Sequence, residues 1–167
     1  AVVVAKDLAG TYGTFHVAAD GSWTYTGNGA HNELTDGQKV SDSITVKSAD
    51  GTASGTITVN ITGTNDAATV SSIAVPVSES NDATSLNASG QLDIADADKG
   101  EAVVVAKDLA GTYGTFHVSA DGSWTYTGNG AHDDLNAGDK VSDSITVTSA
   151  DGTGIGKITV NITGTND

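Results

Sequence analysis

Hydrophobic and polar residues alternate along most of this chain, and the alternation predicts β-strands. In the stretch Thr-Phe-His-Val at 115–118, for example, the apolar Phe116 and Val118 alternate with polar residues, as in a strand with one buried face. No stretch has the spacing of an amphipathic helix. Turn-forming sequences rich in Gly, Asn and Asp separate the alternating stretches, so we expect an all-β fold.

Residues 67–167 contain seven such stretches. We expect strands at 69–77, 86–94, 102–106, around 115–118, 124–126, 141–147 and 158–162. Ala-Asp-Gly turns join the fourth strand to the fifth and the sixth to the seventh, because Asp and Gly tolerate positive φ. Seven short strands in a unit of this size favour a Greek-key, seven-stranded β-sandwich. The expected core is Leu86, Ala88, Leu92, Ile94, Phe116, Val118, Trp124, Tyr126, Val141, Ile145, Val147, Ile158, Val160 and Ile162.

Two residues interrupt the pattern. Pro76 falls within the first strand, where an edge position would tolerate its missing N–H. Asp143 takes the inward parity of Val141 and Ile145, which predicts either a bulge or a buried hydrogen bond.

A long internal repeat organises the chain. Residues 1–66 return as residues 102–167, and ten of the 66 aligned positions differ, five of them in the loop that ends at position 139. A fixed period of this size is typical of a tandem array of folded units. The repeat is out of phase with the strands, so we expect a partial repeat at 1–66 and a complete sandwich at 67–167. We interpret the chain as a piece of a longer protein.

Composition excludes several classes of partner. The chain has 21 acidic residues, seven lysines and no arginine, giving a net charge of −14, which argues against binding to nucleic acid or to anionic membranes. It has no apolar run long enough to be inserted in a membrane, and no cysteine, which is compatible with secretion but leaves the fold without disulfides.

The acids gather at one end of the expected sandwich. Because strands alternate in direction, the loops that carry Asp96, Asp98 and Glu101, then Asp121, then Asp151, lie at the end where the preceding connector arrives. That connector ends in Asn65-Asp66. Carboxylates that converge without Arg or Lys repel one another unless a cation lies between them, and Ca²⁺ suits irregular sites with six to eight oxygen ligands. A solvated acidic surface that keeps the protein soluble is the alternative.

One of these loops, and an acidic segment at the opposite end, qualify this prediction. The segment Asp96-Ala97-Asp98-Lys99-Gly100-Glu101 resembles the start of an EF-hand loop but lacks its third acidic position and flanking helices. At the opposite end, Glu79, Asn81 and Asp82 approach the terminal Asn166-Asp167 and would form half of a second junction, or a plain polar loop.

The sequence offers little for catalysis, and we expect no enzyme activity. His117 is expected on an outward strand position and His132 in a polar loop, and neither has a Cys or a second His nearby for zinc. No nucleophile-elbow motif is present, although a Ser-His-Asp triad stays open at this point.

Taken in order, the strings DIADADKGE, GTYGTFHVSADGSWTYT, VSDSITVTSADG and ITVNITGTND resemble the VCBS-type repeat found in large bacterial surface adhesins, often of the RTX class exported by type I secretion. The resemblance covers the whole 101-residue unit and implies an immunoglobulin-like or cadherin-like sandwich. It also implies calcium-binding linkers similar to those of cadherins. On that basis the first ligand candidates are Asn65, Asp66, Asp96 and Asp98, followed by Glu101 and Asp151.

These expectations combine into a functional hypothesis. The unit would be a calcium-stiffened extender of a giant extracellular adhesin, involved in biofilm formation or cell adhesion. Its partners would be neighbouring repeats, with glycans or cell surfaces contacted through other domains. The rival hypothesis is a carbohydrate- or protein-binding module that uses the loop at 128–139, the most divergent segment between the two copies.

Overall fold

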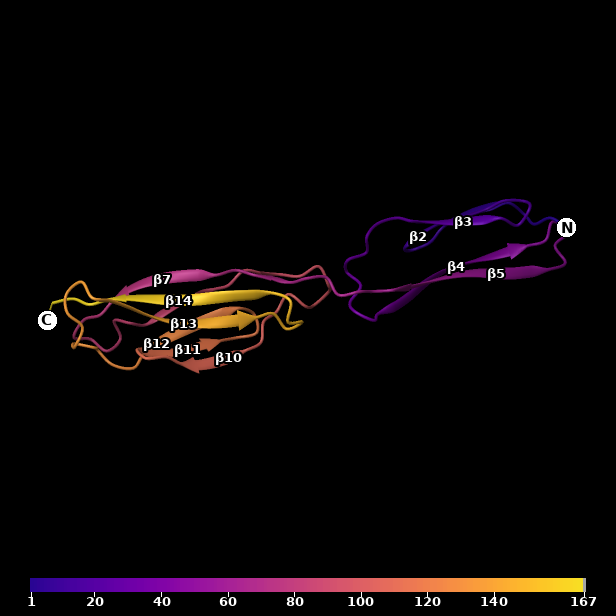
Figure 1. The fold of residues 1–167 in the computed structure, drawn as a ribbon. Helices are drawn as coiled ribbons and strands as arrows, with labels where there is room; N and C mark the ends of the chain where they lie inside the picture. Colours follow the sequence, from indigo (N-terminus) through magenta and orange to yellow (C-terminus); the bar gives the residue numbers. More distant parts are fainter. Residues whose placement is uncertain (167) are drawn as a thin grey trace. The chain divides into compact units, whose positions relative to one another are not determined.

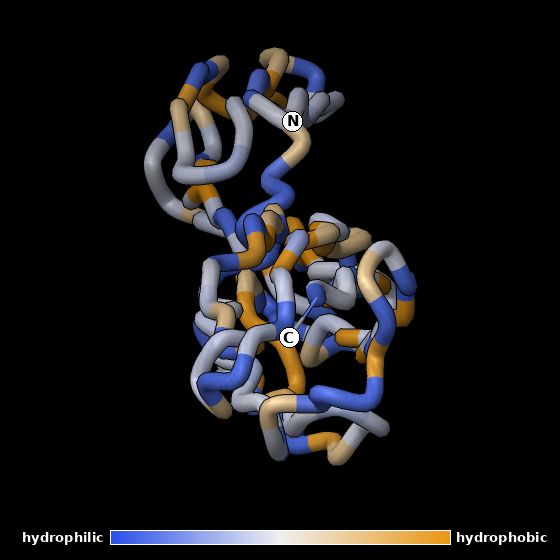
Figure 2. The backbone as a smooth tube through the Cα atoms, turned by 90° about the vertical axis from the view of Figure 1, so that its left-hand side faces the viewer, coloured by the Kyte–Doolittle hydropathy of each residue, from blue (hydrophilic) through white to orange (hydrophobic). Residues whose placement is uncertain are grey.

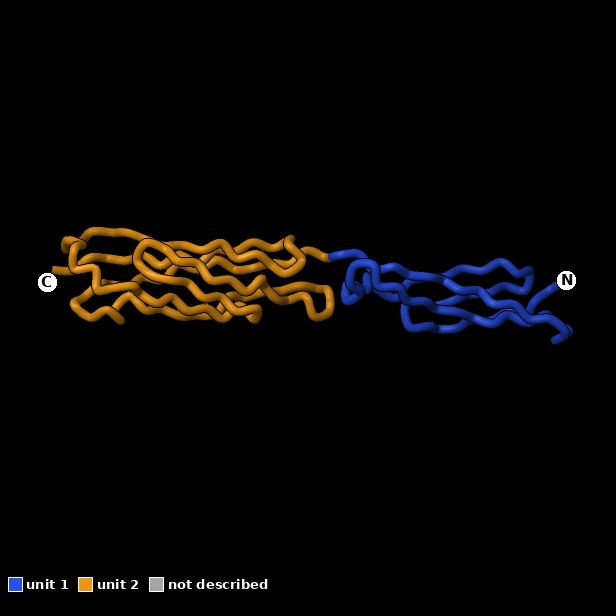
Figure 3. Tube along the Cα trace, turned by 90° about the horizontal axis from the view of Figure 1, so that it is seen from below, with its two compact units in different colours: residues 1–65 blue, residues 66–167 orange. Residues whose placement is uncertain are grey.

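The computed structural model describes residues 1–166, and all of its regular elements in that range are β-strands. No helix in the described part of the chain is long and apolar enough to cross a membrane. The chain divides into two compact units, Ala1–Asn65 and Asp66–Asp167 (Figure 3). The unit boundary lies one residue before the boundary expected from the sequence. Along the backbone, hydrophobic stretches in orange and hydrophilic stretches in blue follow one another (Figure 2).

The second unit is a two-layer β-sandwich. Its strands are β6 (Thr69–Val70), β7 (Ile73–Ser78), β8 (Ala88–Gln91), β9 (Ile94–Ala95), β10 (Lys107–Ala110), β11 (Gly114–Val118), β12 (Ser123–Gly128), β13 (Lys140–Thr148) and β14 (Ile155–Thr163). One layer has the strand order β10-β11-β12-β8 and the other β13-β14-β7 (Figure 1). β8 precedes the β10-β11-β12 meander in the chain but pairs with its last strand, β12. The topology is therefore a Greek key. The predicted all-β sandwich is therefore confirmed.

The core of the second unit lies between these layers. Its fully buried members include Leu86 and Leu92, Phe116, Trp124 and Tyr126, and Ile158, Val160 and Ile162. Ala88, Ile94 and Val141 are partly buried and pack against this cluster. β7 pairs in parallel with β14 at the edge of its sheet, which places Pro76 where no second strand needs its missing N–H.

Three strand boundaries differ from those expected. The first and second strands are each divided in two, as β6 and β7 and as β8 and β9, because β6 pairs with β9 while β7 and β8 join different sheets. The expected strand at 102–106 is wrong. In that segment only Val104 forms a bridge, to Ser149, and the regular strand β10 begins at Lys107.

The first unit contains the same strands without the first part of the sandwich. Its strands are β1 (Lys6–Ala9), β2 (Gly13–Val17), β3 (Trp23–Gly27), β4 (Lys39–Lys47) and β5 (Ser54–Thr62). They form one sheet of order β1-β2-β3 and a pair β4-β5. Only Phe15, Val17 and Ile44 form its buried cluster, with Val3, Tyr25, Val46, Ile57 and Val59 partly buried against it.

Asp143 confirms the predicted buried hydrogen bond, and the register of β13 with β14 runs through it without a bulge. Its carboxylate accepts hydrogen bonds from the Thr112 amide (3.0 Å), the Tyr113 amide (2.8 Å) and the Tyr126 hydroxyl (2.7 Å). Asp42 makes the corresponding bonds in the first unit, including one from the Tyr25 hydroxyl at 2.8 Å. This network ties the loop before β2 or β11 to the opposite layer.

Candidate functional site

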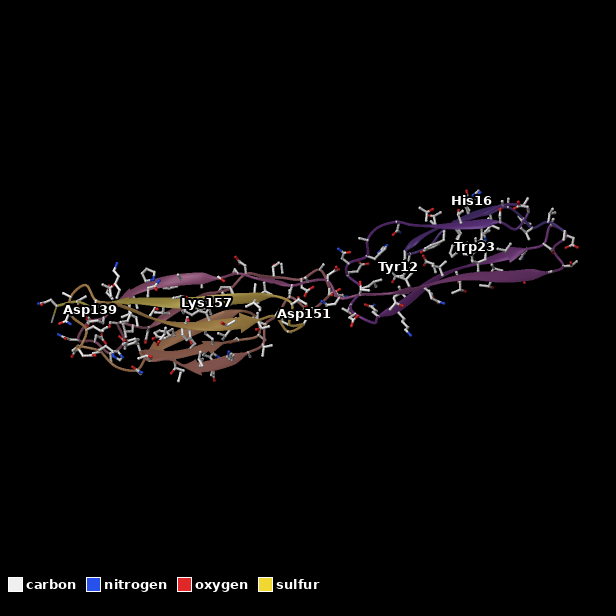
Figure 4. The ribbon with its side chains drawn as sticks, viewed as in Figure 1. Tyr12, His16, Trp23, Asp139, Asp151 and Lys157 are labelled. Carbon is white, nitrogen blue, oxygen red and sulfur yellow. The ribbon has the colours of Figure 1, made fainter. Side chains whose placement is uncertain are left out.

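The acidic loops of the second unit gather at the end where residues 66–68 enter it. The Ala68 amide donates to the Thr153 hydroxyl at 2.8 Å, which ties the entering chain to the loop between β13 and β14. The Ala150 amide of that loop donates to the Val103 carbonyl at 2.9 Å. Figure 4 shows Asp151 in the same loop. The strand directions therefore bring the connector and these two loops together, as alternation of strands requires.

Asp98 connects the entering chain to the loop at 96–101. The Asp66 amide donates to Asp98 Oδ2 at 2.8 Å, and the Asp98 amide donates to Asp96 Oδ1 at 2.9 Å. The Glu101 amide closes the turn on the Asp98 carbonyl at 3.2 Å. Four of the six predicted ligand residues thus belong to one hydrogen-bonded segment, in which backbone amides donate to the carboxylates of Asp96 and Asp98.

Two carboxylate oxygens at this end are buried and have no hydrogen-bond partner. They are Asp98 Oδ1 and Asp96 Oδ2, and the Asp98 residue is only 1 % exposed. A buried ionised oxygen without a partner costs free energy, so native structures almost always pair it with a donor or a cation. The two oxygens fit Ca²⁺, which binds carboxylates with irregular geometry.

Asp151 is placed differently from Asp96 and Asp98. Its carboxylate accepts hydrogen bonds from the hydroxyls of Ser149 and Thr153, so it organises its own turn. Thr153 links that turn to Ala68 and was missed by sequence reasoning; its place in an Asp-Gly-Thr turn was the available signal. Asp121 caps its own turn as well. Hydrogen bonds from the Ser123 hydroxyl and then the Ser123 amide lower the pKa of Asp121.

The described residues do not contain a preassembled metal centre. Among residues 1–166 no group of three or more His, Cys, Asp or Glu side chains is arranged to hold a metal ion. Asp66, Asp96 and Asp98 are adjacent through hydrogen bonds, and Asp151 is linked to the entering chain through Thr153 and Ala68. Asn65 is the last residue of the first unit, and its role as a ligand stays a prediction.

The opposite end of the second unit has its own buried carboxylate. Glu79 is 1 % exposed, and its Oε2 atom has no hydrogen-bond partner, while the other oxygen accepts the Thr165 amide. Asp82 is exposed and holds a turn in which the Thr84 amide and then the Thr84 hydroxyl lower the pKa of Asp82. The predicted neighbour Asp167 lies outside the described residues.

The loop that precedes β13 has a defined geometry. His132 adopts a positive φ of 62°, its Nε2 atom lies 2.6 Å from Asn129 Oδ1, and its ring makes an edge contact with Tyr113 at 5.1 Å between centroids. The first unit repeats this arrangement with His31, although several acids around it differ. The loop therefore holds its central histidine by a hydrogen bond and a ring contact, and its sequence varies at exposed positions.

One arrangement has the order of a catalytic triad. His117 Nδ1 lies 2.5 Å from Asp108 Oδ1, and Ser119 Oγ lies 3.5 Å from His117 Nε2. The His117 and Asp108 side chains are 61 % and 72 % exposed, and the first unit has Ala18 where Ser119 stands. A histidine and an aspartate in open solvent do not form the water-excluded, preorganised site that stabilises a developing oxyanion, so this group does not favour hydrolase activity.

Comparison with known proteins gives three findings. Residues 65–165 match the family described as the bacterial cadherin-like domain. The chain is 31% identical over 183 aligned positions to a protein named calcium-binding lectin RapA2 from Rhizobium johnstonii, covering 95% of this chain and 75% of that protein. The structure of mouse clustered PcdhgC3 EC1-3 is similar with a TM-score of 0.44 and 16% identity, covering 97% of this chain and 56% of that chain.

Proposed function

The chain belongs to the family of bacterial cadherin-like domains, and from this premise we propose that it is a calcium-stiffened extender of a large bacterial cell-surface adhesin. The adhesin would be secreted and would carry many such units in series, holding distal binding domains away from the cell. Export by type I secretion, as in RTX adhesins with VCBS-type repeats, and a role in biofilm formation belong to the same proposal.

The observation that carries this proposal is the pair of buried, unpartnered oxygens on Asp96 and Asp98. A cation bound there would neutralise the two carboxylates and hold the loop at 96–101 against the entering residues, since the Asp66 amide already lies on Asp98. Asn65, Asp66, Glu101 and Asp151 are the residues that would supply further oxygens, together with backbone carbonyls and water. The calcium named for the rhizobial relative supports the choice of metal.

The energy involved is modest and depends on calcium concentration. Extracellular calcium modules have dissociation constants of about 10⁻⁴–10⁻³ M. At about 1 mM Ca²⁺, a site of that affinity adds on the order of 1 kcal/mol to the free energy of unfolding. A cytosol with little free calcium would leave the loop at 96–101 looser, which suits a protein that is exported before it is stiffened.

Isothermal titration of Ca²⁺ into the chain tests the proposal. We expect millimolar or tighter binding that is lost when Asp96 and Asp98 are both replaced by Asn. The matched control replaces Asp133 and Asp134 by Asn, which removes the same charge from the exposed loop and puts at 133 the residue that the first copy has at Asn32. If the control loses binding as completely as the double variant, the site assignment is wrong.

A second function is favoured by the word lectin in the relative's name. The loop at 128–139 would then bind a carbohydrate or a protein, with the rigid His132–Asn129 pair as its frame. A glycan array probed with the whole chain tests this. Binding that disappears on His132→Ala while the calcium titration is unchanged would favour the binding module over the extender.

A further inference from the structure

The chain that enters the second unit is held by two loops at once. The Asp66 amide donates to Asp98 Oδ2 at 2.8 Å, and the Ala68 amide donates to the hydroxyl of Thr153 at 2.8 Å. Asp98 belongs to the loop at 96–101, whereas Thr153 belongs to the turn between β13 and β14. Because one residue separates the two donors, and consecutive Cα atoms lie at a fixed distance of about 3.8 Å, a shift of one amide moves the other.

The orientation of the Thr153 hydroxyl is fixed by Asp151. The hydroxyl donates to Asp151 Oδ2 at 2.5 Å, and the Thr153 amide donates to Asp151 Oδ1 at 3.2 Å. A hydroxyl group has one hydrogen, so Thr153 presents a lone pair to the Ala68 amide. The Ser149 hydroxyl also donates to Asp151 Oδ1, at 2.5 Å, which holds the carboxylate in the turn. Asp151 therefore makes Thr153 an acceptor for the entering chain.

Gly154 shows how closely the entering chain lies on this turn. A Cβ atom on Gly154 would lie 2.8 Å from the Ala68 carbonyl oxygen and 3.2 Å from the Ala68 Cβ atom, and Ala68 is only 5 % exposed. The first copy has Ala53 at this position. Its turn is closed by a hydrogen bond from the Ser48 amide to the Ala53 carbonyl, as the Ser149 amide closes the turn of the second unit. The turn itself therefore accepts alanine, and the contact with Ala68 is what requires glycine in the second unit.

We propose that Thr153 is a positioning residue for the cation site of Asp96 and Asp98, an inference that rests on the proposed function. By holding the Ala68 amide, this residue keeps the Asp66 amide on Asp98 Oδ2. With that oxygen held, the other oxygen, Asp98 Oδ1, stays in its buried place and needs no reorganisation when Ca²⁺ binds. Calcium affinity therefore depends on whether the entering chain is seated on the turn between β13 and β14.

Hydrogen exchange of the full chain in EDTA, followed by NMR, tests the positioning without calcium. Thr153→Val keeps the shape of the side chain and removes the hydroxyl, so we expect faster exchange at the Ala68 amide and also at the Asp66 amide. Thr153→Ser keeps the hydroxyl and should leave both amides as protected as in the original chain. Faster exchange at Ala68 with unchanged exchange at Asp66 would overturn the proposal, because the Asp98 carboxylate would then hold that amide unaided.

A second variant, Gly154→Ala, changes the same contact without removing the hydroxyl. Its methyl group should displace the Ala68 carbonyl and increase exchange at both amides, although Thr153 is intact. The matched control is Thr52→Val, because the Thr52 hydroxyl donates to Asp50 at 2.9 Å in the equivalent turn of the first unit. The control should leave exchange at both amides unchanged. An equal increase in the control would reflect a general loosening of the chain and would overturn the proposal.

Isothermal titration of Ca²⁺ then links this positioning to the site. We expect Thr153→Val and Gly154→Ala to bind calcium about fivefold more weakly than the original chain, as for the loss of one hydrogen bond. Thr153→Ser and Thr52→Val should bind as the original chain does. If Thr153→Val binds calcium as tightly as the original chain, the role of Thr153 is wrong and the proposed function stands. Absence of calcium binding by the original chain would contradict both.

Discussion

The two units share 56 of 66 aligned residues, yet their cores differ. Phe15 and Phe116 are both fully buried, because each lies between strands that both units possess. Trp23 and Trp124 differ most, since only the second unit has the segment at 66–101 that covers the indole. The comparison teaches that burial here is set by one 36-residue segment rather than by the strand sequences themselves.

The largest expected difference between the units concerns these two tryptophans. Replacing the buried Trp124 by Ala should destabilise the second unit by about 3–5 kcal/mol, as for other large-to-small changes in a core. Replacing Trp23 by Ala should cost the first unit much less, because nearly half of its surface is already in water. Calorimetry of the two variants measures both losses, and equal losses would contradict the account of the core.

The buried aspartates Asp143 and Asp42 should behave alike in the two units, because their hydrogen-bond partners do not come from the segment at 66–101. Asp143→Asn replaces one acceptor oxygen by an NH₂ group, so a buried donor that pointed at the carboxylate loses its acceptor. The change should lower the free energy of unfolding by about 2 kcal/mol. Asp42→Asn should destabilise the first unit in the same direction, because Asp42 accepts the equivalent bonds. Urea unfolding checks this; a neutral result at Asp143 would show that its hydrogen bonds contribute nothing.

The tyrosines that bond these aspartates should distinguish the units at high pH. Burial and then the hydrogen bond to Asp42 raise the pKa of Tyr25 to about 12, and the same causes, with Asp143, raise the pKa of Tyr126 further. A raised pKa gives stability that is complete below the unfolded value of about 10 and is lost as the pH rises through the folded value. Absorbance at 295 nm should show Tyr25 ionising first; simultaneous ionisation would contradict the difference in burial.

The smallest expected effect concerns the pKa of one turn aspartate in each unit, and it should be the same in both units. Hydrogen bonds from Ser22 and Ser123 lower the pKa of Asp20 and Asp121, so each turn is stabilised above the unfolded pKa of about 4 and loses that stability as the pH falls below it. Ser22→Ala and Ser123→Ala should each raise the pKa of the neighbouring Asp toward its ordinary value. Carboxyl NMR shifts measure this, and a rise in only one unit would show that the two turns differ.

Much of the fold follows from the sequence because alternation is a local signal. Phe116, Trp124 and Ile158 are buried as predicted, and the inward parity of Asp143 correctly indicates a hydrogen bond. The strand expected at 102–106 is wrong because its apolar run looks like a strand, whereas β10 has four exposed residues and is defined by pairing with β11. Such pairing is tertiary and leaves no local pattern.

The candidate site was predictable only in part for the same reason. Alternating strand directions place Asp66, Asp96 and Asp98 at one end, which the hydrogen bonds at that end confirm. The burial of Asp98 Oδ1 and the hydrogen bond between Ala68 and Thr153 depend on tertiary packing, which no spacing of acids reveals.

Calorimetry of the whole chain with calcium or with EDTA tests the central claim most directly. Because Asp96 and Asp98 belong to the second unit alone, we predict that about 1 mM Ca²⁺ raises its melting temperature by about 5 °C relative to EDTA. The transition of the first unit should not move, and Asp96→Asn with Asp98→Asn should abolish the shift. A melting temperature of the second unit that is the same in calcium and in EDTA would contradict the account.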